Sequence, residues 1–339
     1  MRASLKDVAA RAGVSTMTVS NVLNNKASVA PGTRARVQQA VAELGYRPSL
    51  SARNLARGRS GVVALAVPEI GLPYFAELAH FMMIEAEKRD WTLVVEQTAH
   101  DRGRELALLS GGRGHLIDGV LMFPSEVSAD DVPSGPSGPP VVLFGSASGG
   151  AGGDPVVDHV MIDNLGAGQV ATGHLVAAGR RRIALIGPAY EPRSRRQAPR
   201  VAGYRRALKA AGLTIEKDYI EHGALHDREA GALAMERLLA LPKPPDAVFC
   251  LSDLLAIGAM RTIHRSGRRI PDDIAVLGFD DVDDAAYLTP TLSSMRPDKA
   301  QIAELAVDVL DRRFAAPEPA QVWRANCDLV PRESTLGVS

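Results

Sequence analysis

Short apolar runs alternate with longer amphipathic segments from Gly61 almost to the C-terminus, and this alternation limits the fold more than any other feature. A short run rich in Val, Ile and Leu is typical of a strand buried on both faces. The amphipathic segment after it is typical of a crossover helix. Repeated units of this kind predict parallel sheets covered by helices, so we expect an α/β body.

The order of these segments predicts a body of two lobes. The first lobe is expected at about 61–160 together with 291–325, with strands at 62–67, 92–95, 119–122 and 141–144 and helices at 75–88 and 102–109. The second is expected at about 163–288, with strands at 183–186, 247–251 and 274–277 and helices at 166–178, 200–211, 229–241 and 254–266. A helix at 297–314 is expected to return to the first lobe. Two Gly/Ser/Pro-rich stretches, 134–140 and 145–154, are predicted to be loops.

Charge is divided unevenly between the first 60 residues and the rest of the chain. The 339 residues include 39 basic and 39 acidic side chains, so the formal net charge is zero. Residues 1–60 contain ten basic side chains but only two acidic ones, so this segment carries +8 and the remaining 279 residues carry −8. A small cationic head on an anionic body favours a polyanion as the partner of the head alone.

Within this basic head, the sequence predicts two short helices joined by a tight turn. Ser4 followed by Asp7 favours a helix start, and Gly13 favours its end. Ser15 can cap a second helix, whose small polar residues then face outward, and a third helix is expected at about 32–44. Two short helices with such a polar face are typical of a helix-turn-helix DNA-reading unit.

Four stretches of the sequence match a known pattern: LKDVAARAGVSTMTVSNVLN, VAPGTRARVQQAVAELGYRPS, SARNLARGRS and, near the C-terminus, PRESTLG. They resemble the lactose-repressor (LacI/GalR) family of bacterial transcription regulators, and the resemblance covers essentially the whole chain. It implies a helix-turn-helix domain at 1–48, a hinge helix and linker at 49–60, and a two-lobed, periplasmic-binding-protein-like core at 61–339. It also implies a homodimer that represses from a palindromic operator under the control of a small sugar-like effector.

By position, this resemblance assigns base-reading roles on the second helix to Thr16, Met17 and Asn21. An asparagine amide pairs with adenine, and a methionine can touch a thymine methyl group. Positions that contact phosphates, which fix register without reading sequence, are Ser15, Thr18, Ser20, Asn24 and Thr33. Two residues depart from the family pattern: Ala30 replaces a hydroxyl residue, which puts one phosphate contact in doubt, and Ser49 replaces Asn at the start of the hinge.

Residues 50–57 are expected to form the hinge helix. Eight residues are too few for a stable isolated helix in water, so we expect this one to order against its dimer mate on DNA. Leu55 matches the family's leucine wedge, which enters the minor groove at the centre of the operator, and Arg53 matches a backbone or minor-groove contact. The alternative for Leu55 is an ordinary linker residue.

Ligands of open α/β sheets bind outside the carboxyl ends of the strands, and the candidate effector residues lie there. Arg200 matches the family's effector-clamping arginine, Asp280 its hydroxyl-binding carboxylate, and Tyr74 with Phe75 an aromatic wall. The other candidates in strand-end loops are Ser125, Asp163, His226 and Asp253. A guanidinium fork, a carboxylate and an aromatic ring together suit a polyol such as a sugar.

Three of these assignments have competing explanations. Arg200 is also explained as a structural ion-pair partner, and Asp253 as the cap of the helix that follows it. The acidic run at 280–284 is also explained as a metal loop, although it lacks the Gly and the terminal Glu of a calcium loop.

Enzyme signatures are absent from the sequence. It contains no GxxxxGK[ST], no strand-to-helix GxGxxG and no HExxH, and GSASG places Ala147 where a nucleophile elbow needs serine. We therefore expect no catalysis and no cofactor.

The location of the protein is also predicted from what the sequence lacks. No stretch is apolar enough to span a bilayer, and the N-terminus lacks the apolar core of a secretory signal. We expect a cytoplasmic, nucleoid-associated protein, the rival interpretation being a secreted binding protein. Cys250 and Cys327 are expected to be small buried thiols.

Overall fold

The computed structural model divides the chain into two compact units, Met1–Gly61 and Val62–Ser339. The residues that it describes are 3–23, 29–46, 59–111, 116–133, 138–145, 155–188, 199–223, 227–316 and 318–336. Each unit has a hydrophobic core of its own.

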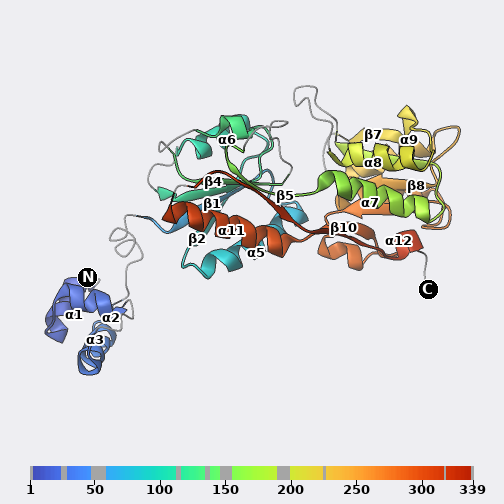
Figure 1. Cartoon of the computed structure of the whole chain (residues 1–339). Helices are drawn as coiled ribbons and strands as arrows, with labels where there is room; N and C mark the ends of the chain where they lie inside the picture. Colours follow the sequence, from blue (N-terminus) through green and yellow to red (C-terminus); the bar gives the residue numbers. More distant parts are fainter. Residues whose placement is uncertain are drawn as a thin grey trace. The chain divides into compact units, whose positions relative to one another are not determined.

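Three helices form the described part of the first unit: α1 (Leu5–Ala12), α2 (Thr16–Leu23) and α3 (Pro31–Glu43) (Figure 1). The Ser4 hydroxyl accepts the Asp7 N–H and the Asp7 carboxylate accepts the Ser4 N–H, so the predicted capping box is confirmed. Gly13 follows α1 with a φ of 62°, as a helix-ending glycine should. One fully buried valine from each helix joins the three: Val8, Val19 and Val37.

The first lobe of the second unit is built on a six-stranded parallel sheet in the order β11-β5-β4-β3-β1-β2. Its strands are β1 (Val62–Val67), β2 (Thr92–Gln97), β3 (Gly119–Met122), β4 (Val141–Phe144), β5 (Asp158–Ile162) and β11 (Val322–Ala325). The helices α5 (Pro73–Glu87) and α11 (Lys299–Ala315) cover one face, and α6 (Arg102–Leu109) covers the other (Figure 1). A short 3₁₀ turn, η2 (Ala129–Asp131), follows β3.

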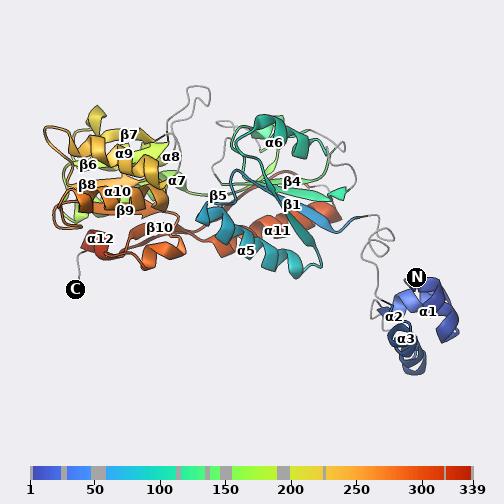
Figure 2. The same ribbon diagram turned by 180° about the vertical axis from the view of Figure 1, so that it is seen from behind.

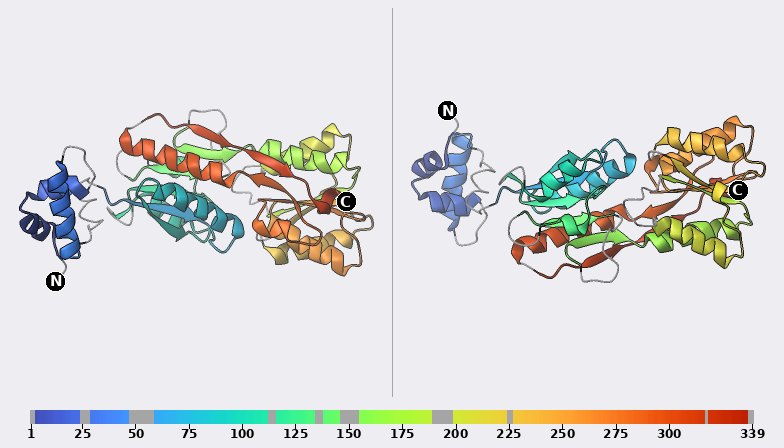
Figure 3. Two further views of the ribbon diagram at one scale, coloured as in Figure 1. Left: turned by 90° about the horizontal axis from the view of Figure 1, so that it is seen from below. Right: turned by 90° about the horizontal axis from the view of Figure 1, so that it is seen from above.

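The second lobe repeats this plan in a sheet of order β12-β10-β9-β8-β6-β7. Its strands are β6 (Ile183–Pro188), β7 (Ile220–Gly223), β8 (Ala247–Cys250), β9 (Ala275–Phe279), β10 (Ser293–Pro297) and the antiparallel β12 (Cys327–Val330). One face is covered by α7 (Asn164–Ala177) and α8 (Pro199–Ala210), the other by α9 (Arg228–Leu239) and α10 (Asp253–Arg265) (Figures 2 and 3). The smaller elements are η4 (Lys217–Tyr219), η5 (Asp283–Ala286) and α12 (Glu333–Leu336).

Both sheets share one winding order, which positions the candidate ligand loops. Counted within each lobe, the first five strands lie in the order 2-1-3-4-5, and one late strand is added at the edge. In such sheets the connections change direction next to the first strand, and ligands bind at the strand ends there. The helix α5 follows the first strand of one lobe, and α8 follows the first strand of the other.

One boundary predicted from the sequence is wrong. Residues 291–325 were assigned together to the first lobe, but β10 pairs in parallel with β9 in the second sheet. The chain therefore returns to the first lobe only at α11, which packs on α5 and β4. The sequence SSMRP of β10 lacks a continuous apolar run, so nothing in its pattern indicated a buried strand.

Glycines bring paired helices of the second lobe into backbone contact. A Cβ added at Gly203 of α8 would lie 2.2 Å from the Leu165 carbonyl oxygen, and one at Gly168 of α7 would lie 2.3 Å from that of Arg200. The other pair is equally close, since a Cβ at Gly258 of α10 would lie 1.9 Å from the Arg228 oxygen. Backbone atoms cannot rotate away as side chains can, so these helices have no room for a methyl group.

Gly203→Ala is therefore expected to lower the free energy of unfolding by about 1–3 kcal/mol, the usual cost of overpacking. Urea denaturation of the full chain measures this change. Gly173→Ala is the matched control, because Gly173 lies in α7 with no atom within 4 Å of an added Cβ. That control should gain up to about 1 kcal/mol from the helix propensity of alanine. Equal effects of the two substitutions would show that the helices have room to separate.

Candidate DNA-reading and effector-binding sites

The exposed side of α2 carries the side chains predicted to read DNA. Val19 and Val22 are buried, whereas Thr16 is exposed and Asn21 is half-buried. Met17 is 69% exposed, although it is a large apolar residue. Met17 and Asn21 are four residues apart and share one face of the helix. The face is thus polar, with one flexible apolar side chain in water.

The predicted phosphate-contacting residues of the described chain lie in α2 and α3 or directly before α2. The Ser15 hydroxyl accepts the Thr18 N–H at 3.1 Å and lies 2.9 Å from the Thr18 hydroxyl, so Ser15 caps α2 as predicted. Ser20 and Thr33 are half-buried. No side chain caps α3 at Ala30, where the sequence lacks the family's usual hydroxyl.

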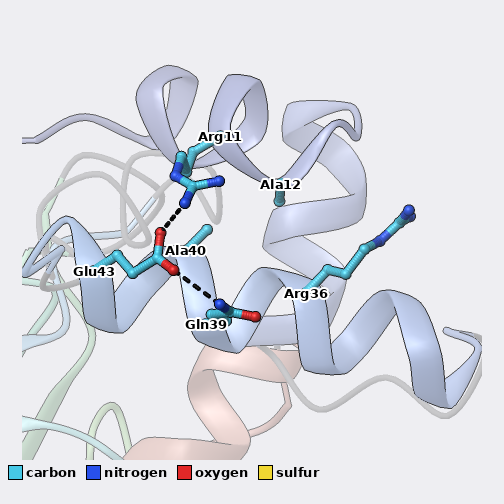
Figure 4. Close-up of a pocket in the computed structure, with 6 residues that line it drawn as sticks. All are labelled: Arg11, Ala12, Arg36, Gln39, Ala40 and Glu43. Atoms are coloured by element: carbon cyan, nitrogen blue, oxygen red, sulfur yellow. Dashed lines mark hydrogen bonds and ion pairs between the residues drawn. The ribbon is translucent and has the colours of Figure 1, made fainter.

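A hollow on the head between α1 and α3 is lined by Arg11, Ala12, Arg36, Gln39, Ala40 and Glu43 (Figure 4). Arg11 forms an ion pair with Glu43, and the Gln39 amide donates to the same carboxylate at 2.9 Å. None of the lining residues belongs to α2. The Arg11–Glu43 pair links α1 to α3, and an exposed pair of this kind contributes about 0–1 kcal/mol to stability.

Four side chains from the two lobes shift one another's pKa through their charges, and we call them the interlobe cluster: Tyr74, Arg200, Asp280 and Cys327. They lie at the start of α5, at the start of α8, directly after β9 and at the start of β12. Burial raises the pKa of the Tyr74 phenol, and the negative charge of Asp280 raises it further. Burial also raises the pKa of the Cys327 thiol, to about 12.

Arg200 is held rigidly within this cluster. Its guanidinium carbon lies 3.4 Å from the centre of the Phe279 ring. Its Nε donates to the Asn164 side-chain oxygen at 2.8 Å, and its Nη1 donates to the Leu251 carbonyl at 3.0 Å. Among the described residues, no carboxylate lies within ion-pair distance of Arg200. This part of the chain therefore gives no support to a structural ion pair, and the hydrogen-bond acceptors of Arg200 there are an amide oxygen and a carbonyl. Burial lowers the pKa of the guanidinium, and Asp280 opposes this shift.

Asp280 is presented by a strained backbone. Its φ is 107° and that of Asp281 is 44°, and such conformations cost on the order of 1 kcal/mol each for residues other than glycine. Burial raises the pKa of the Asp280 carboxyl to about 7, while the charges of Arg200 and Lys299 lower it and that of Glu77 raises it. No described residue donates a hydrogen bond to this carboxylate. It is therefore an acceptor that faces an arginine and has no protein partner in the described chain.

The role predicted for Asp253 needs correction. It neither caps α10, since Ser252 does so through the Leu255 N–H, nor reaches the cluster as an exposed ligand group. Its fully buried carboxylate accepts the Val282 N–H at 2.9 Å and the Ser294 hydroxyl at 2.6 Å. Burial and the neighbouring Asp280 raise its pKa well above the ordinary value. Asp253 thus holds the loop that carries Asp280.

Two other candidates are also committed to the protein itself. The Ser125 hydroxyl donates to the buried Glu105 at 2.5 Å, and Glu105 also accepts three backbone N–H groups of residues 125–127. Phe75 is 7% exposed and packs edge-on against Phe123 at 4.9 Å, so it belongs to the core. Of the predicted aromatic wall, only Tyr74 is part of the interlobe cluster.

The remaining candidates divide into one that lies near the cluster and several outside the described chain. Asp163 is exposed, caps α7 through the Gly166 N–H at 2.9 Å, and raises the pKa of Cys327 by its charge. His226, Asn24, Arg53 and Leu55 lie outside the described residues. The sequence analysis missed Asn164, Phe279, Cys327 and Lys299; only Asn164 and Phe279 carried a signal, because each adjoins a predicted site residue.

The acidic run at 280–284 does not form a metal loop. Asp281 binds Arg332 at 2.7 Å, and Asp284 lies 3.6 Å from Arg228, so its carboxylates point to different partners. Across the described ranges, no three His, Cys, Asp or Glu side chains are grouped to hold a metal ion. No helix in those ranges is both long and apolar enough to cross a membrane.

A three-helix DNA-reading unit and a two-lobed α/β core with a polar interlobe cluster define a ligand-controlled DNA-binding regulator. Residues 4–49 match the bacterial regulatory proteins of the lacI family, and residues 172–335 match the periplasmic binding protein-like domain. The chain is 33% identical to the HTH-type transcriptional repressor CytR of Escherichia coli (strain K12) over 336 residues, which is 98% of this chain and 96% of CytR. The chain belongs to the lacI family of regulators.

Solved structures agree with this assignment. The transcriptional regulator CelR, solved in complex with cellobiose, is 32% identical with a TM-score of 0.70, and the match covers 98% of this chain and 100% of CelR. The lac repressor dimer, solved bound to operator and the anti-inducer ONPF, is 25% identical with a TM-score of 0.81, and that match covers 99% and 100% of the two chains.

The raised pKa of Asp280 predicts how one variant changes stability with pH. An acid whose folded-state pKa lies above its unfolded value stabilises the fold below the unfolded pKa, and this contribution is lost as the pH rises through about 7. Asp280→Asn is therefore expected to melt at a higher temperature than the wild type at about pH 8, with no difference near pH 4. Asp131→Asn should do the opposite near neutrality, because Arg102 lowers the pKa of Asp131 to about 2. Parallel melting curves of Asp280→Asn and the wild type across this range would contradict the assigned environment.

Proposed function

We propose that this chain is a repressor that binds an operator as a homodimer and releases or holds it according to a sugar-like effector in the interlobe cluster. The observation that carries the proposal is the Asp280 carboxylate, which accepts no hydrogen bond from the described residues, together with a rigidly held Arg200, at the strand ends where this type of sheet binds ligands. The same chain carries an exposed helix-turn-helix face.

The chemistry of the cluster favours a polyol as the effector. An ionised carboxylate accepts hydrogen bonds from two adjacent hydroxyls, and charge-assisted bonds of this kind are strong. Arg200 stacks on the Phe279 ring and donates two hydrogen bonds, so its remaining amino nitrogen points in a fixed direction. Tyr74 supplies a ring face for the apolar side of a sugar and, with its raised pKa, a hydroxyl that stays protonated. A cellobiose complex of the relative CelR supports the same ligand class.

The cluster offers little to a catalytic mechanism. Its thiol belongs to Cys327, and the pKa of about 12 keeps that group protonated at neutral pH, so it is a poor nucleophile. Neither Asp280 nor Arg200 contacts a histidine or a nucleophilic hydroxyl among the described residues. These observations support a binding site without a reaction, and thus a regulator that is not an enzyme.

The DNA-binding half of the proposal places α2 in the major groove. Thr16, Met17 and Asn21 would then meet base edges, while Ser15, Thr18, Ser20 and Thr33 would bind phosphates. The hinge at 49–60, with Arg53 and Leu55, is proposed to enter the minor groove between the two half-sites. The lac repressor dimer, which was solved bound to operator, supports operator binding by a dimer. A protein that acts on chromosomal DNA is proposed to work in the cytoplasm, at the nucleoid.

The effector is expected to be found by thermal-shift screening of the full chain. The panel comprises pentoses, hexoses, disaccharides including cellobiose, sugar phosphates, the four ribonucleosides, NAD and ATP. Titration calorimetry of the best ligand should show that Asp280→Ala weakens binding by about 100-fold or more, because the charged acceptor of two ligand hydroxyls is lost. Operator binding should be unchanged in that variant.

Asp283→Ala is the matched control for this experiment, because the Asp283 side chain is exposed in the same loop. It should bind the ligand as the wild type does. Stabilisation by NAD or ATP alone, or normal binding by Asp280→Ala, would refute the effector site.

Operator recognition is tested by selecting preferred duplexes from a random palindromic library. Met17→Ala and Asn21→Ala should each weaken binding to the selected duplex by about 10- to 100-fold, since each removes a base contact. Affinity for random DNA and its salt dependence should stay the same, because phosphate contacts set both. Gln38→Ala, an exposed residue of α3, is the control. Equal losses on random and selected DNA would contradict base reading by α2.

A further inference from the structure

The loop after β9, residues 280–283, is held by several contacts from the second lobe. Asp253 accepts the Val282 N–H, the Ser294 hydroxyl accepts the Asp281 N–H at 3.1 Å, and Arg332 binds the Asp281 carboxylate. These three partners all belong to the second lobe or its C-terminal segment. They hold two successive residues in left-handed conformations, with φ values of 107° and 44°.

A fourth set of contacts comes from outside that lobe. Lys299 opens α11, the helix that packs on the first lobe, and its side chain is 8% exposed. Its ammonium donates to the Asp281 carbonyl at 2.9 Å and pairs with the Glu77 carboxylate at 2.9 Å. The other Glu77 oxygen accepts the Asp283 N–H at 3.0 Å. Glu77 thus reaches the loop twice, once directly and once through Lys299.

Glu77 lies on α5 of the first lobe, three residues after Tyr74 and on the same helix face. The charge of Asp280, on the other lobe, raises the pKa of the Tyr74 phenol. The helix α11, which carries Lys299, packs on α5 in the same lobe. A motion that moves this lobe away from the loop therefore keeps the Glu77–Lys299 pair, but it must break the bond from the Asp283 N–H to Glu77 and the bond from Lys299 to the Asp281 carbonyl.

We infer that Glu77 and Lys299 form an interlobe latch that positions Tyr74 against Asp280 and so sets the affinity of the core for its effector. The effect of the latch on effector affinity rests on the proposed function, but the latch itself can be tested without any ligand. With the latch formed, the ligand groups of both lobes already face one another. With it broken, a larger fraction of molecules holds the lobes apart, and the apparent affinity falls by that fraction.

The test uses the full chain and three variants: Glu77→Gln, Lys299→Met and the double variant. Hydrogen–deuterium exchange, with no sugar present, is followed in the peptide that contains residues 280–285. Each single variant is expected to exchange at least about fivefold faster in this peptide, with β8 and β9 as protected as in the wild type. Because both residues act in one contact, the double variant should exchange no faster than the faster single variant.

Lys88→Met is the matched control. Lys88 directly follows α5, the helix that carries Glu77, and pairs with Glu85 at 2.6 Å. The substitution thus removes a lysine whose ion-pair partner lies outside the loop. Its exchange in the 280–285 peptide should equal that of the wild type.

Calorimetric titration with cellobiose as the probe then measures the consequence. Both single variants are expected to bind about tenfold more weakly than the wild type, and the double variant no more weakly than either. Unchanged exchange in the 280–285 peptide of both variants, or acceleration spread evenly over the second lobe, would overturn the latch. If the wild type binds no member of the sugar panel, the proposed effector fails, while the exchange experiment still decides on the latch.

Discussion

The buried carboxylate of Asp253 is the interaction on which the candidate ligand site depends. Its bonds to the Val282 N–H and the Ser294 hydroxyl hold the chain just after Asp280, where the backbone is left-handed. Together with the contacts of Ser294 and Arg332, this anchor holds the two residues in conformations that cost free energy when they are not glycine. A fully buried side chain thus helps to determine where the proposed ligand-binding group lies.

The regular part of the fold was largely predictable, and the reason is burial on both faces. Strands such as β3 and β4 are fully buried, and their continuous apolar runs stand out from the sequence around them. Helix starts were equally visible where a side chain caps them, as at Ser4 and Ser15. Five strands were missed, because each mixes polar residues with a few apolar ones: β5, β7, β10, β11 and β12. A strand with one covered face, or with a short pairing partner, needs few apolar residues to be stable. Hydrophobicity alone therefore does not reveal such strands.

The candidate site was predictable in kind but only partly in its members. Asp253 and Asp280 follow predicted strands, and Asp163 was expected where the chain first crosses between the lobes, so all three were candidates for the same site. Within the described residues, one anchors a loop, one caps a helix and one accepts no hydrogen bond. Which role each takes depends on donors far away in sequence, such as Val282 for Asp253. Cys327 and Lys299 were missed for the same reason, because only the folded chain brings β12 and α11 to the loop after β9.

The tight glycine contact between α7 and α8 has a consequence for how this core can change its ligand. The carbonyl oxygen of Arg200 would lie 2.3 Å from a Cβ at Gly168, so the backbone that carries the arginine abuts the neighbouring helix directly. Both the backbone and the guanidinium of Arg200 are therefore held in place by their neighbours. New specificities would then arise by replacing side chains around an unmoving arginine, while Gly168 itself resists substitution in every one of them.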